Sequence, residues 1–174
     1  TPEHLANVRR ISADTGGDAG FFTPAGRGSY EIAMLSAGGV LSALEAIMAG
    51  EIDNAYALVR PPGHHAIAGE GMGFCIFGNA AIAGFHALES LGVKRIAFVD
   101  WDVHHGNGTE ACVRNVSRNP NIGRERYSRF QSFTDSLTGC TFRYQAKPAI
   151  QFKPWLDSSD VEDIFFASIH GFGD

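Results

Sequence analysis

The residues best suited to chemistry are two carboxylates and a histidine that follow an apolar run in the middle of the chain. Asp100, Asp102 and His104 stand at alternate positions. Residues two apart in extended chain point to the same side, so these side chains form one polar edge. Burying them unpartnered would be costly, and a cation among them would remove that cost. Zinc suits carboxylate and imidazole donors, so the pattern predicts a metal site; a chance pattern on a solvated loop is the alternative.

A second polar group consists of two adjacent histidines, His64 and His65, which follow the sequence Arg-Pro-Pro-Gly. Adjacent histidines rarely pack for structural reasons, because each ring brings two nitrogens that need partners. Beside a water activated by a metal, one of them could take a proton and later protonate a leaving amine. On its own, such a pair is more often a surface coincidence or a pair of metal ligands.

The segment 69–75 is a glycine-rich loop with a single aromatic residue, Phe74. It lacks the third glycine and the Lys-Ser/Thr of phosphate-binding loops. Its glycines would let the backbone approach a ligand closely, with Phe74 as an apolar wall.

The elements that must position these groups alternate between strands and helices. Short apolar runs predict buried strands at 55–59, 96–99 and 164–169. Helical spacing or composition predicts helices at 2–12, 30–48 and 79–91. This alternation predicts a parallel α/β sheet, in which sites form at the carboxyl ends of the strands.

Two stretches interrupt that alternation. Residues 13–29 are rich in glycine and predict a surface loop. The segment 111–160 is polar, and we interpret it as a long irregular excursion with a hairpin of its own. Its arginines favour a solvated face, with a partner or anion-binding role as the alternative: Arg114, Arg118, Arg124, Arg126 and Arg129.

Composition indicates one globular domain. The chain has 174 residues, 44% hydrophobic and 19% charged, and its 14 basic and 19 acidic residues give a net charge of −5. This balance argues against direct nucleic-acid binding. Three cysteines without CxxC spacing argue for a reducing compartment and against a cysteine-built zinc site. No signal peptide is visible and no apolar stretch approaches membrane-span length, so we expect a soluble protein of the nucleus or cytoplasm.

Three motifs together resemble the class II histone deacetylases, the bacterial deacetylase-like amidohydrolases and the acetylpolyamine amidohydrolases. The motifs are residues 56–66, 71–75 and 99–109, with weaker likeness at 16–20, 29–31 and 168–174. The resemblance covers nearly the whole chain and is weakest in 111–160. It implies an α/β fold of the arginase/deacetylase kind, a three-layer parallel β-sheet flanked by helices. Residues 1–174 are then part of one catalytic domain.

The resemblance also implies a role for each matching residue. Asp102 and His104 match two of three zinc ligands. His64 and His65 match the pair beside the catalytic water, with His65 as general base. Their partners would be Asp100 for His64 and Asn107 for His65.

Further roles concern the substrate and a second cation. The resemblance implies that Phe74 is one wall of the acyl-lysine tunnel and that the Gly73 carbonyl accepts the amide N–H. Asp100, Asp102 and Ser168 match contributors to a monovalent-cation site, usually potassium.

The family pattern places its third zinc ligand, an oxyanion-stabilising Tyr or His and a second aromatic wall beyond position 174. The chain lacks an initiator Met and stops after an apolar run, so we expect it to be a fragment. Catalytic zinc normally has three protein ligands. Residues 1–174 alone are therefore expected to bind zinc weakly and to turn over little substrate.

For the complete protein we expect zinc-dependent hydrolysis of acetyl-lysine in histones or other proteins, with a role in chromatin regulation. Hydrolysis of acetylpolyamines or other small amides, and a non-catalytic acyl-lysine reader or scaffold, are the alternatives. A binuclear manganese hydrolase of the arginase kind is disfavoured, because Gly106 stands where that chemistry needs a bridging Asp. The expected partners are acetylated proteins or small acetylated amines, without a membrane; a co-regulator complex and a homo-oligomer are left open.

Overall fold

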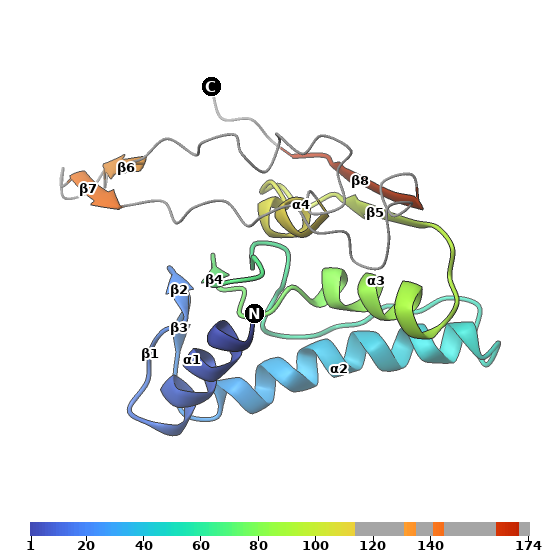
Figure 1. The fold of residues 1–174 in the computed structure, drawn as a ribbon, viewed down its shortest axis with the longest axis horizontal. Coiled ribbons are helices and arrows are strands. Elements are labelled where there is room, and N and C mark those ends of the chain that lie inside the picture. The colour runs from blue at the N-terminus through green and yellow to red at the C-terminus, as the bar shows by residue number, and fades with distance from the viewer. Residues whose placement is uncertain (114–130, 135–140, 145–162, 171–174) are drawn as a thin grey trace.

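A computed structural model describes residues 1–113, 131–134, 141–144 and 163–170, whose arrangement is shown in Figure 1. The helices in these residues are α1 (Pro2–Ala13), α2 (Ser29–Met48), α3 (Asn79–Ser90) and α4 (Asn107–Val113). The strands are β1 (Gly17–Asp18), β2 (Gly20–Phe21), β3 (Pro24–Ala25), β4 (Gly71–Met72), β5 (Ile96–Asp100), β6 (Gln131–Thr134), β7 (Thr141–Tyr144) and β8 (Ile164–Ser168). The three predicted helices match α1 to α3 to within one residue at each end.

The strands that carry the site are β5 and β8, which pair in parallel although more than 60 residues separate them along the chain. Their register runs from Ile96↔Ile164 to Asp100↔Ser168. Both strands therefore end at the same edge, where the polar side chains gather. The prediction that these strands are fully buried is wrong for the described residues, since Val99 is 52% and Phe165 is 59% exposed.

Helices α2 and α3 form a layer on one side of this strand pair. Figure 1 shows α2, α3 and the β5–β8 pair stacked in that order. A Cβ at Gly84 of α3 would lie 2.3 Å from the ring of Phe98, so only glycine lets α3 approach β5 this closely. Ser36 of α2 donates to the carbonyl of Pro61 (2.9 Å) and accepts from the side chain of Asn79 (2.9 Å). These bonds hold the loop that leads to the tandem histidines against both helices.

The predicted strand at 55–59 is wrong. The segment is an irregular, exposed stretch in which Tyr56 and Leu58 are each 84% exposed. In the described part of the chain β5 pairs with β8 alone, and residues 55–59 make no backbone hydrogen bond. An apolar run becomes a strand only when a neighbour satisfies its backbone groups, and no described strand does so here.

The best-packed core lies at the N-terminal end and not around the strand pair. Val8 and Ile11 of α1 are buried with Ile76 and Phe77. His4 of α1 is also buried, and its Nε2–H donates to the carbonyl of Ile76 at 2.8 Å. This core anchors the segment that follows the 69–75 loop.

The glycine-rich stretch 13–29 is more ordered than the predicted loop. Strands β1 and β3 pair antiparallel, and β2 pairs in parallel with β4 of the 69–75 loop. The carboxylate of Asp18 accepts from the backbone N–H of Gly20 (3.0 Å) and of Thr23 (2.9 Å). The pairing of β2 with β4 brings Phe21 next to Met72.

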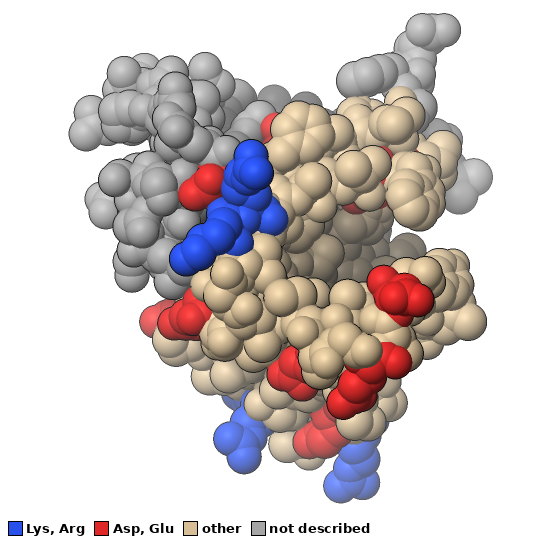
Figure 2. All heavy atoms as spheres, turned by 90° about the vertical axis from the view of Figure 1, so that its right-hand side faces the viewer, with Lys and Arg blue, Asp and Glu red and all other residues tan. Residues whose placement is uncertain are grey.

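Within the segment 111–160, the structure describes the end of α4 and an antiparallel pair, β6 with β7. The register of the pair runs from Gln131↔Tyr144 to Thr134↔Thr141. The arginines expected on a solvated face lie outside the described residues. On the face seen in Figure 2, basic side chains form one small patch and isolated points, while acidic ones are more widespread.

Helix α2 is long and apolar enough to cross a membrane by length and composition alone. An 18-residue window has a mean hydropathy of 1.5, and 17% of it is buried. This overturns the expectation that no apolar stretch approaches span length. It is weak evidence for a span, because core helices of soluble proteins pass the same test. Two carboxylates also tie α2 to other helices: Glu31 accepts from Ser12 (3.1 Å), and Glu45 pairs with His86 (3.0 Å).

Candidate active site

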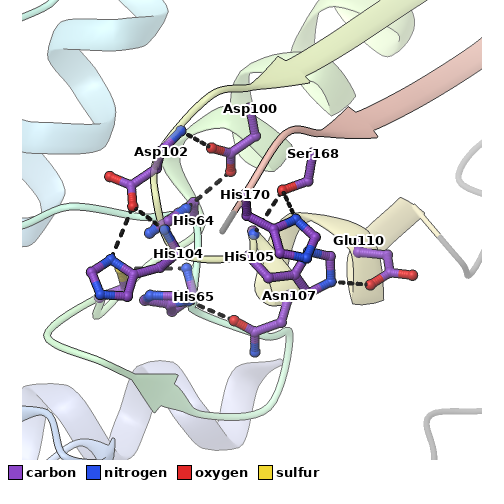
Figure 3. A network of polar contacts seen from close by, with 12 residues as sticks. His64, His65, Asp100, Asp102, His104, His105, Asn107, Glu110, Ser168 and His170 are labelled. Carbon is purple, nitrogen blue, oxygen red and sulfur yellow. Dashed lines mark hydrogen bonds and ion pairs between the residues drawn. The ribbon is translucent and has the colours of Figure 1, made fainter. Parts of the chain in front are cut away.

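All the predicted site residues except those of the 69–75 loop are drawn in Figure 3, and they converge at one edge of the molecule. The tandem histidines come from the loop before α3. Asp100 comes from the end of β5, Asp102 and His104 from the segment after β5, Asn107 from the start of α4, and Ser168 from the end of β8. A cleft of about 400 Å³ borders His64, Asp100 and Asp102. The site therefore combines segments that are far apart in the sequence.

His64 is paired with a carboxylate. Its Nδ1–H donates to Oδ2 of Asp100 at 2.9 Å, and the two side chains are 21% and 15% exposed. The other carboxylate oxygen of Asp100 accepts from the backbone N–H of Asp102 at 3.1 Å. The bond to Asp100 fixes the orientation of the His64 ring. Its other nitrogen, Nε2, is then the atom that could exchange a proton with a substrate.

His65 is paired with a neutral amide. Its Nδ1–H donates to Oδ1 of Asn107 at 2.5 Å, and the amide group of Asn107 donates to the sulfur of Met72 at 3.1 Å. The second bond orients the amide so that its oxygen faces His65. Burial lowers the pKa of His65, although the bond to Asn107 opposes the shift. A neutral ring with Nδ1–H committed to Asn107 carries a lone pair on Nε2, as a general base requires.

Helix α4 holds the backbone of the tandem histidines. The N–H groups of Gly108 and Thr109 both donate to the carbonyl of His64, at 2.8 and 3.1 Å. A Cβ at Gly108 would lie 2.3 Å from the backbone carbon of His65, and one at Gly73 would lie 2.7 Å from the His65 ring. Both glycines are therefore required sterically. The two rings lie 4.0 Å apart, tilted by 38°.

The two predicted zinc donors sit in a different environment. The side chains of Asp102 and His104 are 49% and 72% exposed. Oδ1 of Asp102 accepts from the backbone N–H of His104 at 2.8 Å and lies 3.0 Å from its Nδ1. The backbone bond from His104 lowers the pKa of Asp102 and keeps it a carboxylate. Of the three groups only Asp100 is largely buried, so the prediction of a metal here rests on the types of donor and not on the cost of burying them.

The donor set nevertheless fits zinc in kind. A carboxylate oxygen and an imidazole nitrogen 3.0 Å apart are close enough to bind one ion. Among the described residues no group of three or more His, Cys, Asp or Glu side chains is arranged to hold a metal. The site thus presents two donors where a catalytic zinc has three.

The residues implied for a potassium site are only partly together. Asp100 and Ser168 are partners in the β5–β8 register, and Ser168 accepts from the N–H of Gly106 at 3.3 Å. The side chain of Asp102 is turned toward His104 instead. The potassium site remains a prediction.

Phe74 is 63% exposed, as a residue that walls a ligand channel would be. Sequence analysis missed a second aromatic group beside it. The N–H groups of Gly73 and Phe74 donate to the carbonyls of Phe21 (2.9 Å) and Phe22 (3.1 Å), and the rings of Phe21 and Phe22 meet edge to face at 4.6 Å. The only sequence signal was two adjacent phenylalanines in an otherwise small and polar stretch.

Comparison with known proteins relates the chain to deacetylases. A family model described as "Histone deacetylase domain" matches residues 1–127. The chain is 54% identical to a histone deacetylase-like amidohydrolase from Pseudomonas aeruginosa over 111 residues, which cover 63% of this chain and 29% of that protein. It is 46% identical to polyamine deacetylase HDAC10 from Rattus norvegicus over 93 residues, 53% of this chain and 15% of that protein.

A solved structure of the HDA15 HD domain aligns with a TM-score of 0.60 and 43% identity, over 63% of this chain and 31% of that chain. This confirms the fold class, α/β of the arginase/deacetylase kind, of which the described residues contain the parallel β5–β8 pair and the helices on one side. The chain spans under a third of the length of each of these relatives. The sequence resemblance is confirmed as well, and the chain belongs to the histone deacetylase family.

Proposed function

We propose that the protein containing this chain hydrolyses the acetyl amide of acetyl-lysine in histones or other proteins, with zinc as its cofactor. One observation carries the proposal: each tandem histidine has its Nδ1–H committed to a separate acceptor, Asp100 or Asn107. Both Nε2 atoms are then left for proton transfer at the substrate. A chance pair of surface histidines would not be expected to have two separate orienting partners.

The chain's own residues divide the chemistry between them. Asp102 and His104 would hold zinc, which when bound polarises an amide carbonyl and lowers the pKa of a nearby water. Nε2 of His65 accepts the proton of the attacking water, while Asn107 keeps the ring in the required tautomer. The histidine pair then protonates the departing amine. Asp100 holds the ring of His64 in place during this step, as Asn107 does for His65.

Substrate placement is proposed from the 69–75 loop. The exposed ring of Phe74 would pack against the methylene stem of the substrate, and the Gly73 carbonyl would accept the amide N–H. Any substrate with an amide on a flexible stem satisfies these contacts. The similarity to a polyamine deacetylase makes acetylpolyamines the second candidate substrate.

We also propose that residues 1–174 are part of one catalytic domain and that by themselves they bind zinc weakly, because the described residues offer two donors. Cys75 and Cys112 are free thiols, as is usual in a reducing compartment, and burial raises the pKa of both, that of Cys112 to about 11.

The proposal is tested with the full-length protein, stripped of metal by a chelator and then resupplied with zinc. An acetyl-lysine peptide and an N-acetylated polyamine are offered in parallel. Peptide hydrolysis that returns with zinc supports the proposal. Preferential hydrolysis of the polyamine would mean that the substrate is an acetylpolyamine and not acetyl-lysine. A protein that binds zinc and peptide but hydrolyses neither would be an acyl-lysine reader.

A further inference from the structure

The residue after the proposed zinc donor His104 is also a histidine, and it faces the opposite way. Figure 3 shows His104 directed toward Asp102, and His105 directed toward Glu110 and His170. The side chain of His105 is 37% exposed, compared with 72% for His104. The segment after β5 therefore presents one imidazole to the site and the other to the protein behind it.

His105 contacts three side chains, one from α4 and two from β8 or just after it. Its Nε2–H donates to Oε2 of Glu110 in α4 at 2.6 Å. Its ring lies 4.4 Å from that of His170, just after β8, and 6.5 Å from that of Phe166 within β8. Its Nδ1 is buried and has no hydrogen-bond partner among the described residues. The bond to Glu110 is thus the polar contact that selects the Nε2–H tautomer and the ring orientation of His105.

The backbone of Glu110 is also hydrogen-bonded to the segment that follows His105. Its N–H donates to the carbonyl of Gly106 at 3.0 Å, and the N–H of Gly106 donates to Ser168 at 3.3 Å. A Cβ at Gly106 would lie 2.1 Å from Oδ2 of Asp100, so the backbone here packs directly on the carboxylate that orients His64. A shift of the 104–106 segment would therefore move both a metal donor and a partner of the tandem histidines.

We infer that Glu110 is a positioning residue, which acts through His105 to fix the segment carrying His104. The inference rests on the proposed function, since it treats His104 as a metal donor. The competing explanation is that Glu110 merely places a negative charge in the first turn of α4, where the helix dipole favours it. The two explanations differ in what a glutamine at position 110 should do, because its amide oxygen can still accept from His105 but its charge is gone.

The test uses the full-length protein loaded with Co²⁺, whose visible absorption depends on the arrangement of its ligands. We expect Glu110→Ala to lower Co²⁺ affinity about tenfold and to alter the absorption band, as loss of orienting partners does at other metal sites. Glu110→Gln should restore both. Glu45→Ala is the matched control, because it removes a 3.0 Å Glu–His pair away from the site and should change neither. Parental affinity and spectrum in Glu110→Ala, or equal damage in the Ala and Gln variants, would overturn the inference.

A second measurement needs no metal. Nitrogen-15 NMR of the histidine rings in the metal-free protein should show the Nε2–H tautomer of His105 in the parent and in Glu110→Gln, and a mixture in Glu110→Ala. The same tautomer in all three proteins would overturn the inference. A parent that takes up no Co²⁺ counts against the proposed function, and the tautomer of His105 then decides separately whether Glu110 holds it.

Discussion

The two halves of the candidate site, the tandem histidines and the pair Asp102 and His104, differ in how many contacts hold their side chains in place. The tandem histidines each have an orienting partner, a fixed backbone and close glycine contacts. Asp102 and His104 contact mainly each other and are about half or more exposed. Proton transfer requires a set tautomer and direction, which local contacts supply. Metal binding requires several donors converging from different segments, and the described residues supply two.

This difference teaches that the two functions are separable by mutation. A change at the tandem histidines should impair chemistry and spare the metal, whereas a change at the exposed pair should release the metal. The following predictions test that separation in the full-length protein, in order of decreasing effect.

The largest effect is expected from His65→Ala. Loss of the general base should lower kcat/KM about 10³-fold, within the range for acid–base catalysts. Bound zinc, measured by atomic emission, should stay at the parental level because His65 is not a proposed donor.

His104→Ala is the counterpart and should lose the zinc as well as the activity. Equal loss of zinc from the two variants would show that the halves are not separable and that the roles are misassigned.

Gly108→Ala should act through stability. Its Cβ would lie 2.3 Å from the backbone of His65, which forces α4 away from the tandem histidines. We expect a loss of about 3 kcal/mol in the free energy of unfolding, measured by urea denaturation.

Gly38→Ala is the control for Gly108→Ala, since no heavy atom lies within 4 Å of its Cβ position. In the interior of α2 it should be neutral or stabilise by up to about 1 kcal/mol. Similar behaviour of the two variants would contradict the close packing of α4 on the histidines.

Asn107→Ala removes the acceptor that orients His65. A decrease in kcat of about 10- to 100-fold is expected, with zinc retained, by analogy with partners of other catalytic imidazoles. Asn107→Asp keeps an acceptor at Nδ1 and should recover much of the loss; failure to do so would argue that the amide has a different role.

Met72→Leu should have the smallest effect. Leucine has a similar volume, and the sulfur is only a weak acceptor for the Asn107 amide. We expect kcat within about threefold of the parent. A loss as large as that of Asn107→Ala would mean that the amide orientation depends on this contact.

Much of the site could be predicted because its motifs are local. The spacing of Asp100, Asp102 and His104 after an apolar run is readable from the sequence, and the resemblance implied the pairing of His64 with Asp100 and of His65 with Asn107 that the structure contains. Their catalytic roles stay predictions. Helix α2 was predictable because its apolar residues recur at helical spacing along most of its 20 residues, and α1 and α3, of 12 residues each, were predicted as well.

The remaining features of the fold and the site could not be predicted, because they depend on contacts between segments that are far apart in the sequence. Residues 55–59 have the composition of a buried strand, but strand formation requires a neighbouring backbone. Helix α4 has only 7 residues and includes a glycine and a threonine, so its propensity is low and its contacts with His64 support it instead. The approach of Phe21 and Phe22 to Phe74 follows from a pairing of two-residue strands, which leaves no periodic signal.

The glycines around the site also bear on how related genes are interpreted. At Gly73, Gly106 and Gly108, an added methyl group would lie less than 3 Å from His65 or Asp100. A paralogue could keep every ionisable side chain of this site and still be unable to assemble it if one of these positions carried alanine. Surveys for decayed members of the family should therefore inspect these glycines as well as the histidines and aspartates.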